Sequence, residues 1–200
     1  MTQVIFATKN KGKIREITEL LKDMPLEILS MEEAGLSMEI EENGTTFEEN
    51  ALIKARAVCK ASGCYALADD SGLAVDYLDG APGVYSARYM GEETPYEIKN
   101  QKIISLLEKA KGKERRAQFV SVIAFVTPQG EEMTTRGVIE GEIGYESKGE
   151  NGFGYDPIFY VPEYDMTTAQ MSLELKNKIS HRGKALGAMK EKLDAYFKMK

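Results

Sequence analysis

The sequence predicts an α/β fold built on a mixed β-sheet flanked by helices. Short apolar runs that suit buried strands alternate with segments of helical periodicity, as in Val4–Thr8 followed by Ile14–Leu21. Two long alternating segments, Arg116–Thr127 and Glu132–Glu140, are joined by Pro128-Gln129-Gly130, which is typical of a hairpin and makes the sheet mixed. The 200 residues suit one large domain or two tightly joined lobes.

The helix after Thr46 carries the clearest local signal. Thr46 with Glu49 three residues on is a capping box, and Gly63 ends the helix near Ser62. Its inward positions are expected to be Phe47, Ala51, Ala55, Val58 and Cys59. The other expected elements are a strand at Glu27–Ser30, a strand at Ala74–Leu78, a helix with Pro95 at its first position and an apolar face to Ala110, a strand at Ile158–Val161, and a last helix capped by Ser180.

The composition describes an ordinary globular chain with an acidic balance. Hydrophobic residues make up 42% and charged residues 29% of the chain, so disorder is not expected. The formal net charge of -6 argues against general binding to nucleic acid polymers, but suits a phosphorylated small molecule bound with a divalent metal. Cys59 and Cys64 lack metal-site spacing, and no window approaches a membrane span, so we expect a cytoplasmic protein with free thiols.

One stretch joins an apolar run to a group of polar side chains, Tyr65-Ala66-Leu67-Ala68-Asp69-Asp70-Ser71-Gly72-Leu73. We expect a buried strand whose carboxyl end opens into a site, with Gly72 allowing a sharp turn. Neighbouring side chains of an extended chain point to opposite faces, so Asp69 and Asp70 are expected to do different jobs. One would face a ligand or metal while nearby backbone holds the other. An Asx-type turn that closes the strand is the alternative interpretation.

A second candidate site is the turn Thr8-Lys9-Asn10-Lys11-Gly12-Lys13. It lies between a strand and a helix, so unpaired N–H groups and the positive end of the helix dipole can bind an anion. The lysines add charge, and Thr8 and Asn10 can form hydrogen bonds. The spacing is not that of a Walker A loop, and a solvated lysine-rich turn is the alternative.

Three further stretches carry polar groups that suit a nucleotide site. Glu41 and Glu42 lie in an acidic loop and can supply an oxygen ligand to a metal shared with Asp70, or form a solvated charge run. The segment Phe153-Gly154-Tyr155-Asp156 offers aromatic rings and a carboxylate to a nucleobase, or is a glycine-aromatic turn. His181 and Arg182 open the last helix, where cations oppose the dipole unless an anion is present, which favours a ligand contact.

Six motifs occur in one order along the chain and together resemble one family. They are Thr8–Lys13, Thr46-Phe47-Glu48-Glu49-Asn50-Ala51, Asp69–Leu73, Pro82-Gly83-Val84-Tyr85-Ser86-Ala87-Arg88-Tyr89, Phe153-Gly154-Tyr155-Asp156-Pro157-Ile158-Phe159 and Ser180-His181-Arg182. The chain resembles the Ham1-like inosine triphosphate pyrophosphatases over essentially its whole length. The resemblance implies a single domain with an elongated two-lobed α/β fold around a long mixed sheet, as in ITPase and Maf-like proteins. It also implies hydrolysis of XTP, ITP and dITP to the monophosphate plus pyrophosphate, Mg²⁺ dependence and a homodimer.

The resemblance also assigns roles to residues, motif by motif. Asp70 is implied as the proton acceptor and a metal ligand, with Glu42, or its neighbour Glu41, as the second carboxylate at the metal. The substrate contacts implied are Thr8, Lys9, Asn10, Lys11, Gly12, Lys13, Ser71, Phe153, Gly154, Tyr155, Asp156, Lys176, His181 and Arg182, with Lys178 as a neighbour of Lys176.

One implied role conflicts with elementary electrostatics. A carboxylate bound to Mg²⁺ is a weaker base, so either Asp70 orients the attacking water or Asp69 shares the role of base. The alternative functions are a pyrophosphatase of pyrimidine or methylated nucleotides and a non-catalytic nucleotide sensor.

Overall fold

The computed structural model describes residues 2–198 and contains one seven-stranded mixed sheet with the strand order β2-β1-β3-β4-β5-β6-β7. Strand β1 pairs in parallel with β2 and β3, whereas β6 pairs antiparallel with β5 and β7. The strands are β1 (Thr2–Phe6), β2 (Leu26–Ser30), β3 (Tyr65–Val75), β4 (Arg116–Val126), β5 (Glu132–Ile143), β6 (Phe159–Val161) and β7 (Met166–Thr167). The predicted α/β class with a mixed sheet is confirmed.

Helices of two kinds connect these strands. The α-helices are α1 (Lys11–Leu21), α2 (Phe47–Ser62), α3 (Tyr96–Leu106), α4 (Leu173–Ile179) and α5 (His181–Lys198). Short 3-10 helices span Asp76–Leu78, Gly83–Tyr85, Gly112–Arg115, Asp156–Ile158 and Pro162–Tyr164. Within the described part of the chain, no helix has the length and apolarity that crossing a membrane requires.

The chain divides into two compact units. Unit 1 comprises residues 1–70, 121–137 and 181–200, and unit 2 comprises residues 71–120 and 138–180. Strands β3, β4 and β5 contribute residues to both units. The expectation that the whole chain is one domain stays a prediction.

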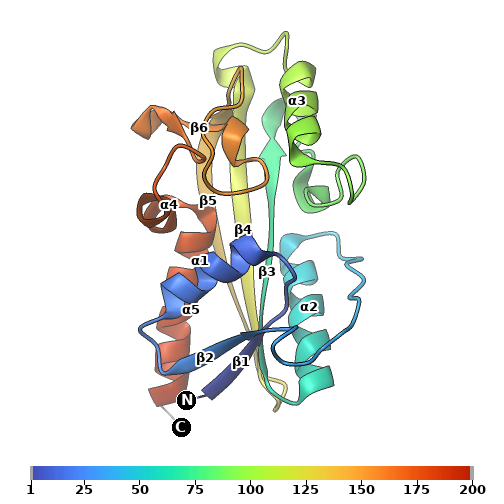
Figure 1. Cartoon of the computed structure of the whole chain (residues 1–200), viewed down its shortest axis with the longest axis vertical. Helices are drawn as coiled ribbons and strands as arrows, with labels where there is room; N and C mark the ends of the chain where they lie inside the picture. Colours follow the sequence, from blue (N-terminus) through green and yellow to red (C-terminus); the bar gives the residue numbers. More distant parts are fainter. Residues whose placement is uncertain (1, 199–200) are drawn as a thin grey trace. The chain divides into compact units, whose positions relative to one another are not determined.

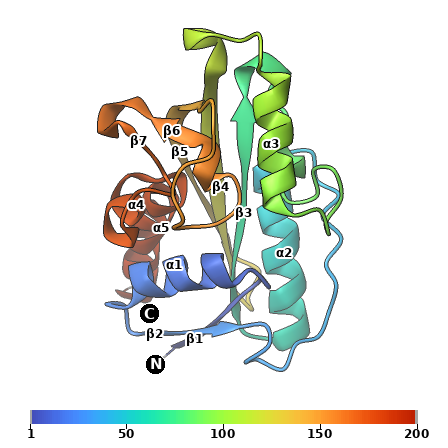
Figure 2. The ribbon, with the colours of Figure 1, turned by 45° about the horizontal axis from the view of Figure 1, so that its top comes forward.

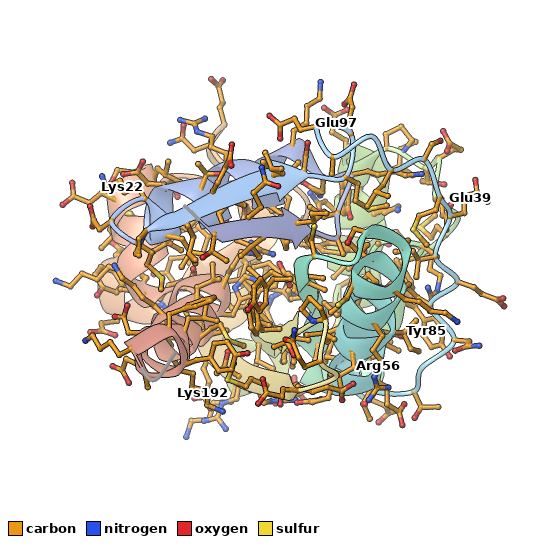
Figure 3. All side chains as sticks on the ribbon, turned by 90° about the horizontal axis from the view of Figure 1, so that it is seen from below. Lys22, Glu39, Arg56, Tyr85, Glu97 and Lys192 are labelled. Atoms are coloured by element: carbon orange, nitrogen blue, oxygen red, sulfur yellow. The ribbon has the colours of Figure 1, made fainter. Side chains whose placement is uncertain are left out.

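In unit 1, α1 and α5 lie on one face of the sheet and α2 lies on the other (Figure 1). The apolar core between the sheet and the α1–α5 pair is built from residues of β1, β3, β4 and both helices. Its largest members include Phe6, Ile17, Leu67, Phe125 and Leu186. Charged side chains such as those of Lys22, Arg56 and Lys192 point outward from this unit (Figure 3). Residues predicted for the inner face of α2, from Phe47 to Cys59, are buried.

The caps of α2 are as predicted. Glu49 N donates to the Thr46 hydroxyl at 3.1 Å, and Thr46 N donates to the Glu49 carboxylate at 3.2 Å, which completes the capping box. Gly63 adopts a left-handed conformation with φ of 70° and closes the helix by donating to Cys59 O. Cys59 and Cys64 are free thiols.

In unit 2, α3 lies alongside the end of β3 (Figure 2), and Ile103 and Leu107 pack with Leu73 and Val75 in one core. The buried guanidinium of Arg115 fixes the end of this helix. It donates to the carbonyls of Leu107 at 2.7 Å, Ile143 at 2.7 Å and Gly144 at 2.8 Å, and more weakly to that of Ala110. One side chain therefore satisfies carbonyls at the end of α3 and beyond the end of β5.

Several sequence-based boundaries are wrong, because local signals cannot report sheet pairing. Strand β3 does not end at the two aspartates but continues through Ser71 and Gly72 to Val75, so Gly72 makes no turn and Asp76–Leu78 is a 3-10 helix.

Pro95 precedes α3 as its N-cap, and the helix ends at Leu106, which is partly exposed. The hairpin at Pro128–Gly130 is confirmed, since Gly130 N donates to Thr127 O and Thr127 N to Glu131 O.

Candidate active site

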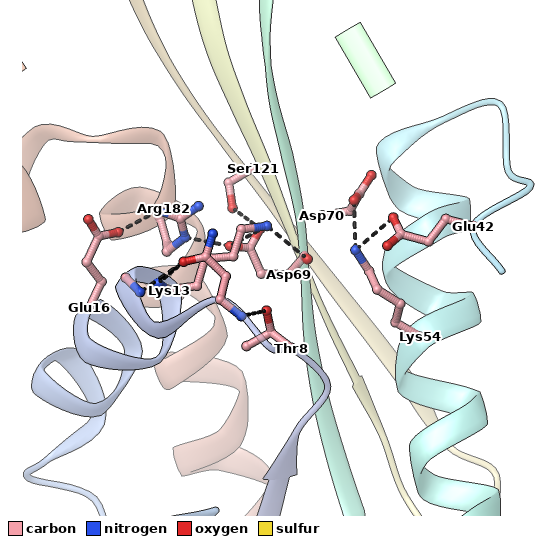
Figure 4. Close-up of polar contacts among 11 residues, drawn as sticks. Thr8, Lys13, Glu16, Glu42, Lys54, Asp69, Asp70, Ser121 and Arg182 are labelled. Atoms are coloured by element: carbon pink, nitrogen blue, oxygen red, sulfur yellow. Dashed lines mark hydrogen bonds and ion pairs between the residues drawn. The ribbon is translucent and has the colours of Figure 1, made fainter. Parts of the chain in front are cut away.

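Strand β3 carries the two neighbouring aspartates of unit 1 on opposite faces. Figure 4 shows Asp69 pointing toward α1 and α5 and Asp70 pointing toward α2. Both side chains are buried, at 1% and 6% exposure. Because successive side chains of a strand alternate between faces, the pleat separates two adjacent carboxylates into two different environments. The prediction that they face different groups is confirmed.

Asp69 lies in a fully paired network of buried charges. Its carboxylate accepts from Arg182 Nε and from the Ser121 hydroxyl at 3.2 Å, and Lys13 Nζ lies 3.6 Å away. Arg182 Nη1 donates in turn to Glu16 of α1. Burial alone would raise the pKa of Asp69, but the Arg182 and Lys13 cations hold it below its usual value. Side chains, rather than the nearby backbone that the sequence suggested, hold this carboxylate as an anion.

Asp70 is only partly paired. Its Oδ1 accepts from Lys54 Nζ at 2.8 Å, and the same ammonium donates to Glu42 at 3.0 Å. Its Oδ2 is buried and has no hydrogen-bond donor among the described residues. Burial raises the pKa of Asp70 to about 6, against the opposing effect of Lys54. This carboxylate therefore has an acceptor site that no side chain or backbone group in the described part of the chain fills.

The Asp70 face fits a divalent cation. Two carboxylates, Asp70 and Glu42, both form ion pairs with the Lys54 ammonium, and Asp70 Oδ2 has no hydrogen-bond donor among residues 2–198. Among residues 2–198, no group of three His, Cys, Asp or Glu side chains could hold a metal alone. Mg²⁺ commonly takes one or two carboxylates and completes its shell with water and substrate phosphates, so two suffice. Glu41 is exposed, which favours Glu42 of the two adjacent candidates.

The Thr8–Lys13 turn forms the N-terminus of α1 and is capped from within. Asn10 Oδ1 accepts from Gly12 N at 2.9 Å and Lys13 N at 3.2 Å, and Thr8 Oγ1 accepts from Asn10 N at 3.1 Å. Two of the N–H groups that the sequence offered to an anion are thus already bound to Asn10, so that expectation is wrong for them. Lys9 and Lys11 are exposed, whereas Lys13 points toward Asp69.

The first turn of α5 contains His181 and Arg182, which are 5% and 2% exposed. The sequence argument required an anion to offset cations at this helix start. For Arg182, the protein's own carboxylates of Asp69 and Glu16 provide that anion.

Unit 2 holds the glycine-aromatic segment, and Asp156 organises it. Its Oδ2 accepts from Phe153 N at 2.8 Å and from Lys176 Nζ at 2.6 Å, and its Oδ1 accepts from Thr168 Oγ1 at 2.8 Å. The Lys176 ammonium also lies 4.9 Å from the centre of the Phe153 ring. These contacts bring together the sequence-predicted residues Phe153, Asp156 and Lys176.

The remaining predicted residues of unit 2 divide between buried and exposed positions. Tyr155 is buried and its hydroxyl donates to Ser86 O at 2.8 Å, while Gly154 has a φ of 68° that suits glycine. Lys178 is exposed, so the structure favours Lys176 of these two lysines. Ser71 lies in β3 directly after Asp70.

Comparison with known proteins places this geometry in a family. The Ham1 family model matches residues 4–192. The chain belongs to the Ham1 family. It is 49% identical to a dITP/XTP pyrophosphatase of Geobacter sulfurreducens, over 96% of this chain and 97% of that protein. It is 47% identical to a dITP/XTP pyrophosphatase of Clostridium perfringens, over 99% of this chain and all of that protein.

Solved Ham1 structures share the fold. The structure of a HAM1 protein from Coxiella burnetii matches with a TM-score of 0.88 and 43% identity, over 98% of this chain and 100% of that one. The Staphylococcus aureus Ham1 protein matches with a TM-score of 0.86 and 42% identity, over the same shares. The family predicted from six ordered motifs is confirmed.

The structure of this Ham1-family chain adds residues that sequence reasoning missed. Lys54 is buried on the inner face of α2, one turn from Ala51 and Val58, and a lysine on an apolar helix face was the available signal. Glu16 accepts from Arg182, and Ser121 donates to Asp69. Both are tertiary contacts, which no local sequence pattern reports.

Proposed function

We propose that this protein hydrolyses the non-standard purine nucleoside triphosphates XTP, ITP and dITP to the monophosphate plus pyrophosphate, and so removes them from the nucleotide pool. One observation carries the proposal in this chain. Asp70 is a buried carboxylate with one acceptor oxygen left open, beside a lysine and a second carboxylate. Membership of a family whose relatives are named dITP/XTP pyrophosphatases supports the substrate class.

The reaction is attack of water on the α-phosphorus. A bond forms between the water oxygen and this phosphorus, the bond to the bridging oxygen breaks, and pyrophosphate leaves with the electron pair. We assign Asp70 Oδ2 to hold the attacking water and to accept its proton, because this oxygen is buried and no residue that the structure describes donates to it. The Lys54 ammonium, 2.8 Å from Asp70 Oδ1, stabilises negative charge that develops beside it.

Mg²⁺ is proposed as the cofactor, held by Asp70 and Glu42, and when bound it would neutralise phosphate charge in the transition state. Since a metal-bound carboxylate is a weaker base, orienting the water is the larger part of the role given to Asp70. Asp69 is proposed to position Lys13 and Arg182 rather than to share the base role, because its oxygens are already bound to those cations and to Ser121.

The substrate contacts are proposed from the motifs together with the observed exposure. Lys9 and Lys11 are exposed and supply positive charge for the triphosphate, while Asn10 holds the turn in shape. Lys13, Ser71, His181 and Arg182 keep the substrate roles that the family resemblance implies. The segment Phe153–Asp156 with Lys176 is assigned to the base.

Discrimination between bases follows from hydrogen-bond chemistry. A 6-oxo purine presents an acceptor where adenine presents an amino donor. A donor in the site, such as the Lys176 ammonium or a main-chain N–H, therefore forms a hydrogen bond with the 6-oxo group but faces another donor when adenine is bound. Unmatched polar pairs in a buried site carry a large penalty, which is the basis of selectivity against adenine nucleotides. Guanine also has a 6-oxo group, so its exclusion requires an obstacle or an unmatched group near its 2-amino group.

Product analysis tests the proposal. The protein is incubated with dITP, XTP, dATP and dGTP, each with Mg²⁺ or with EDTA. We expect monophosphate and pyrophosphate from dITP and XTP, and none with EDTA. Orthophosphate release, or equal rates on dATP, would refute the assignment. Tight binding without turnover would instead support a nucleotide sensor.

The assembly and location are also proposals. We propose a homodimer, a cytoplasmic location and a single catalytic domain spanning the chain. Sedimentation of the purified protein tests the dimer, since a monomer at assay concentration would contradict it.

A further inference from the structure

The first turns of α3 hold two polar side chains inside unit 2 where a helix usually buries apolar ones. Lys99 is 0% and Asn100 is 3% exposed. Neither residue belongs to the predicted site, and neither forms an ion pair among the described residues. Their polar atoms instead reach main-chain carbonyls of two loops. Lys99 Nζ donates to Ala87 O at 2.7 Å, and Asn100 Nδ2 donates to Gly154 O at 3.1 Å.

The second contact falls in the middle of the glycine-aromatic segment. In a trans peptide the C=O and the following N–H point in opposite directions, so holding the Gly154 carbonyl also fixes the direction of the Tyr155 N–H. Gly154 has a φ of 68°, a conformation that glycine adopts without strain. The intrinsic preference of glycine for this conformation is weak, so its backbone can also rotate into others. An external hydrogen bond is therefore needed to fix this peptide plane.

A neighbouring side chain of α3, that of Tyr96, packs beside the same segment. The Tyr96 ring packs edge-on against the Tyr155 ring, with centroids 5.2 Å apart. A Cβ atom at position 154 would lie 3.6 Å from the Tyr96 ring, so the space on this side of Gly154 is bounded by the helix. The other end of the segment is fixed independently, through the bonds of Asp156 to Phe153, Thr168 and Lys176. Asn100 thus controls the centre of the segment and not its ends.

The Asn100 amide is not explained by stability. Its Oδ1 is buried and has no hydrogen-bond partner among residues 2–198. A buried amide with one end unsatisfied is no more stabilising than an apolar side chain of similar size, because the unmet acceptor loses its water without replacement. The Asn100 Nδ2 group forms the hydrogen bond of this side chain, and it is the group that holds the Gly154 carbonyl.

We infer that Asn100 is a positioning residue that determines base selectivity, by fixing the Gly154–Tyr155 peptide against which the purine base is read. This inference rests on the proposed function, in which Phe153–Asp156 binds the base. It makes the discrimination between a 6-oxo purine and adenine depend on a side chain of α3 that contacts no substrate.

The test compares Asn100→Leu with wild type. The leucine keeps the volume and removes the donor together with the unsatisfied acceptor. We expect the melting temperature to change by less than about 3 °C, since apolar replacement of an imperfectly paired amide is close to neutral. We expect the KM for dITP to rise about five- to tenfold with kcat changed less than about twofold, and the dITP-to-dATP ratio of kcat/KM to fall by about the same factor, the size expected for one neutral hydrogen bond.

Two further variants separate positioning from a structural role. Asn100→Asp removes the donor but keeps the shape, and should lose selectivity as Asn100→Leu does. Lys99→Met removes the neighbouring contact to Ala87 O, and should change the melting temperature without changing the selectivity ratio. A lower melting temperature for Asn100→Leu with unchanged KM and selectivity would overturn the inference. Wild-type protein that hydrolyses no purine triphosphate would overturn the proposed function, and this inference with it.

Discussion

Exchanging each of the two adjacent aspartates for asparagine should give opposite results. Asp69→Asn removes the charge that pairs with the buried cation Arg182 and with the half-buried Lys13. Breaking a buried ion pair from one side costs about 3–5 kcal/mol, and we expect the lower end, about 3 kcal/mol, because Glu16 still pairs with Arg182. For a chain of this length, that corresponds to a fall in melting temperature of roughly 6–12 °C.

The matched variant, Asp70→Asn, should behave differently. The asparagine amide oxygen can accept from Lys54 in place of Oδ1, and Lys54 keeps its contact with Glu42. Burial already disfavours the charged form of Asp70, whose pKa it raises to about 6, so removing this charge costs less than removing that of Asp69. We expect the melting temperature to stay within about 3 °C of wild type. The rate of dITP hydrolysis should fall by about 100- to 10,000-fold, the contribution of a positioned base. For Asp69→Asn, assayed well below its melting temperature, the rate should fall by no more than about tenfold.

Thermal unfolding followed by circular dichroism and a pyrophosphate-release assay measure both quantities. Melting in the absence of nucleotide avoids stabilisation by bound substrate. The reasoning is refuted if Asp69→Asn keeps the wild-type melting temperature and loses activity as severely as Asp70→Asn. That result would make Asp69 the base and leave its pairing with Arg182 without energetic consequence.

Three other variants test further features. Lys54→Met leaves two carboxylates without their shared cation, so Mg²⁺ alone should raise the melting temperature of the variant more than that of wild type; an equal shift would contradict the proposed metal position. Arg115→Met deprives carbonyls at the ends of α3 and β5 of their donors and should lower the melting temperature by roughly 6–16 °C, from a cost of about 3–4 kcal/mol. Gly137→Ala would place a Cβ against His181 O, so a loss of about 1–3 kcal/mol is expected in urea unfolding, and an unchanged midpoint would show that α5 can move away from β5.

Local patterns predicted the elements whose signals are themselves local. The capping box of Thr46 and Glu49 and the left-handed Gly63 bound α2 because each acts within a few residues of the chain. The turn at Pro128–Gly130 joins its two strands for the same reason.

The end of β3 was predicted wrongly because Asp-Asp-Ser-Gly is a turn signal only in the absence of pairing partners. Here neighbouring strands supply those partners, so the chain stays extended through Ser71 and Gly72. The strand order brings β1 and β4 to either side of β3 from distant parts of the sequence.

The candidate site shows the same division. The motif residues were found by their family resemblance, but their partners were not. Lys54 and Ser121 contact the aspartates from 16 and 52 positions away, Glu16 pairs with Arg182 across 166 positions, and no periodicity encodes those pairings. Asn100 was missed because a polar residue on a helix is ordinarily read as exposed.

The uninterrupted extension of β3 through Asp69 and Asp70 limits how the gene can change. The two carboxylates owe their separate environments to the parity of their positions, and not to any difference in chemistry between them. Insertion or deletion of one codon between Tyr65 and Ala68 would, if the pairing of the later residues followed, exchange the faces of every side chain beyond it. A single mutation would therefore turn Asp69 toward the face that Asp70 occupies and Asp70 toward the face that Asp69 occupies. We therefore expect length variation among natural variants to fall in irregular segments such as 31–46, and this strand to keep its length even where its sequence drifts.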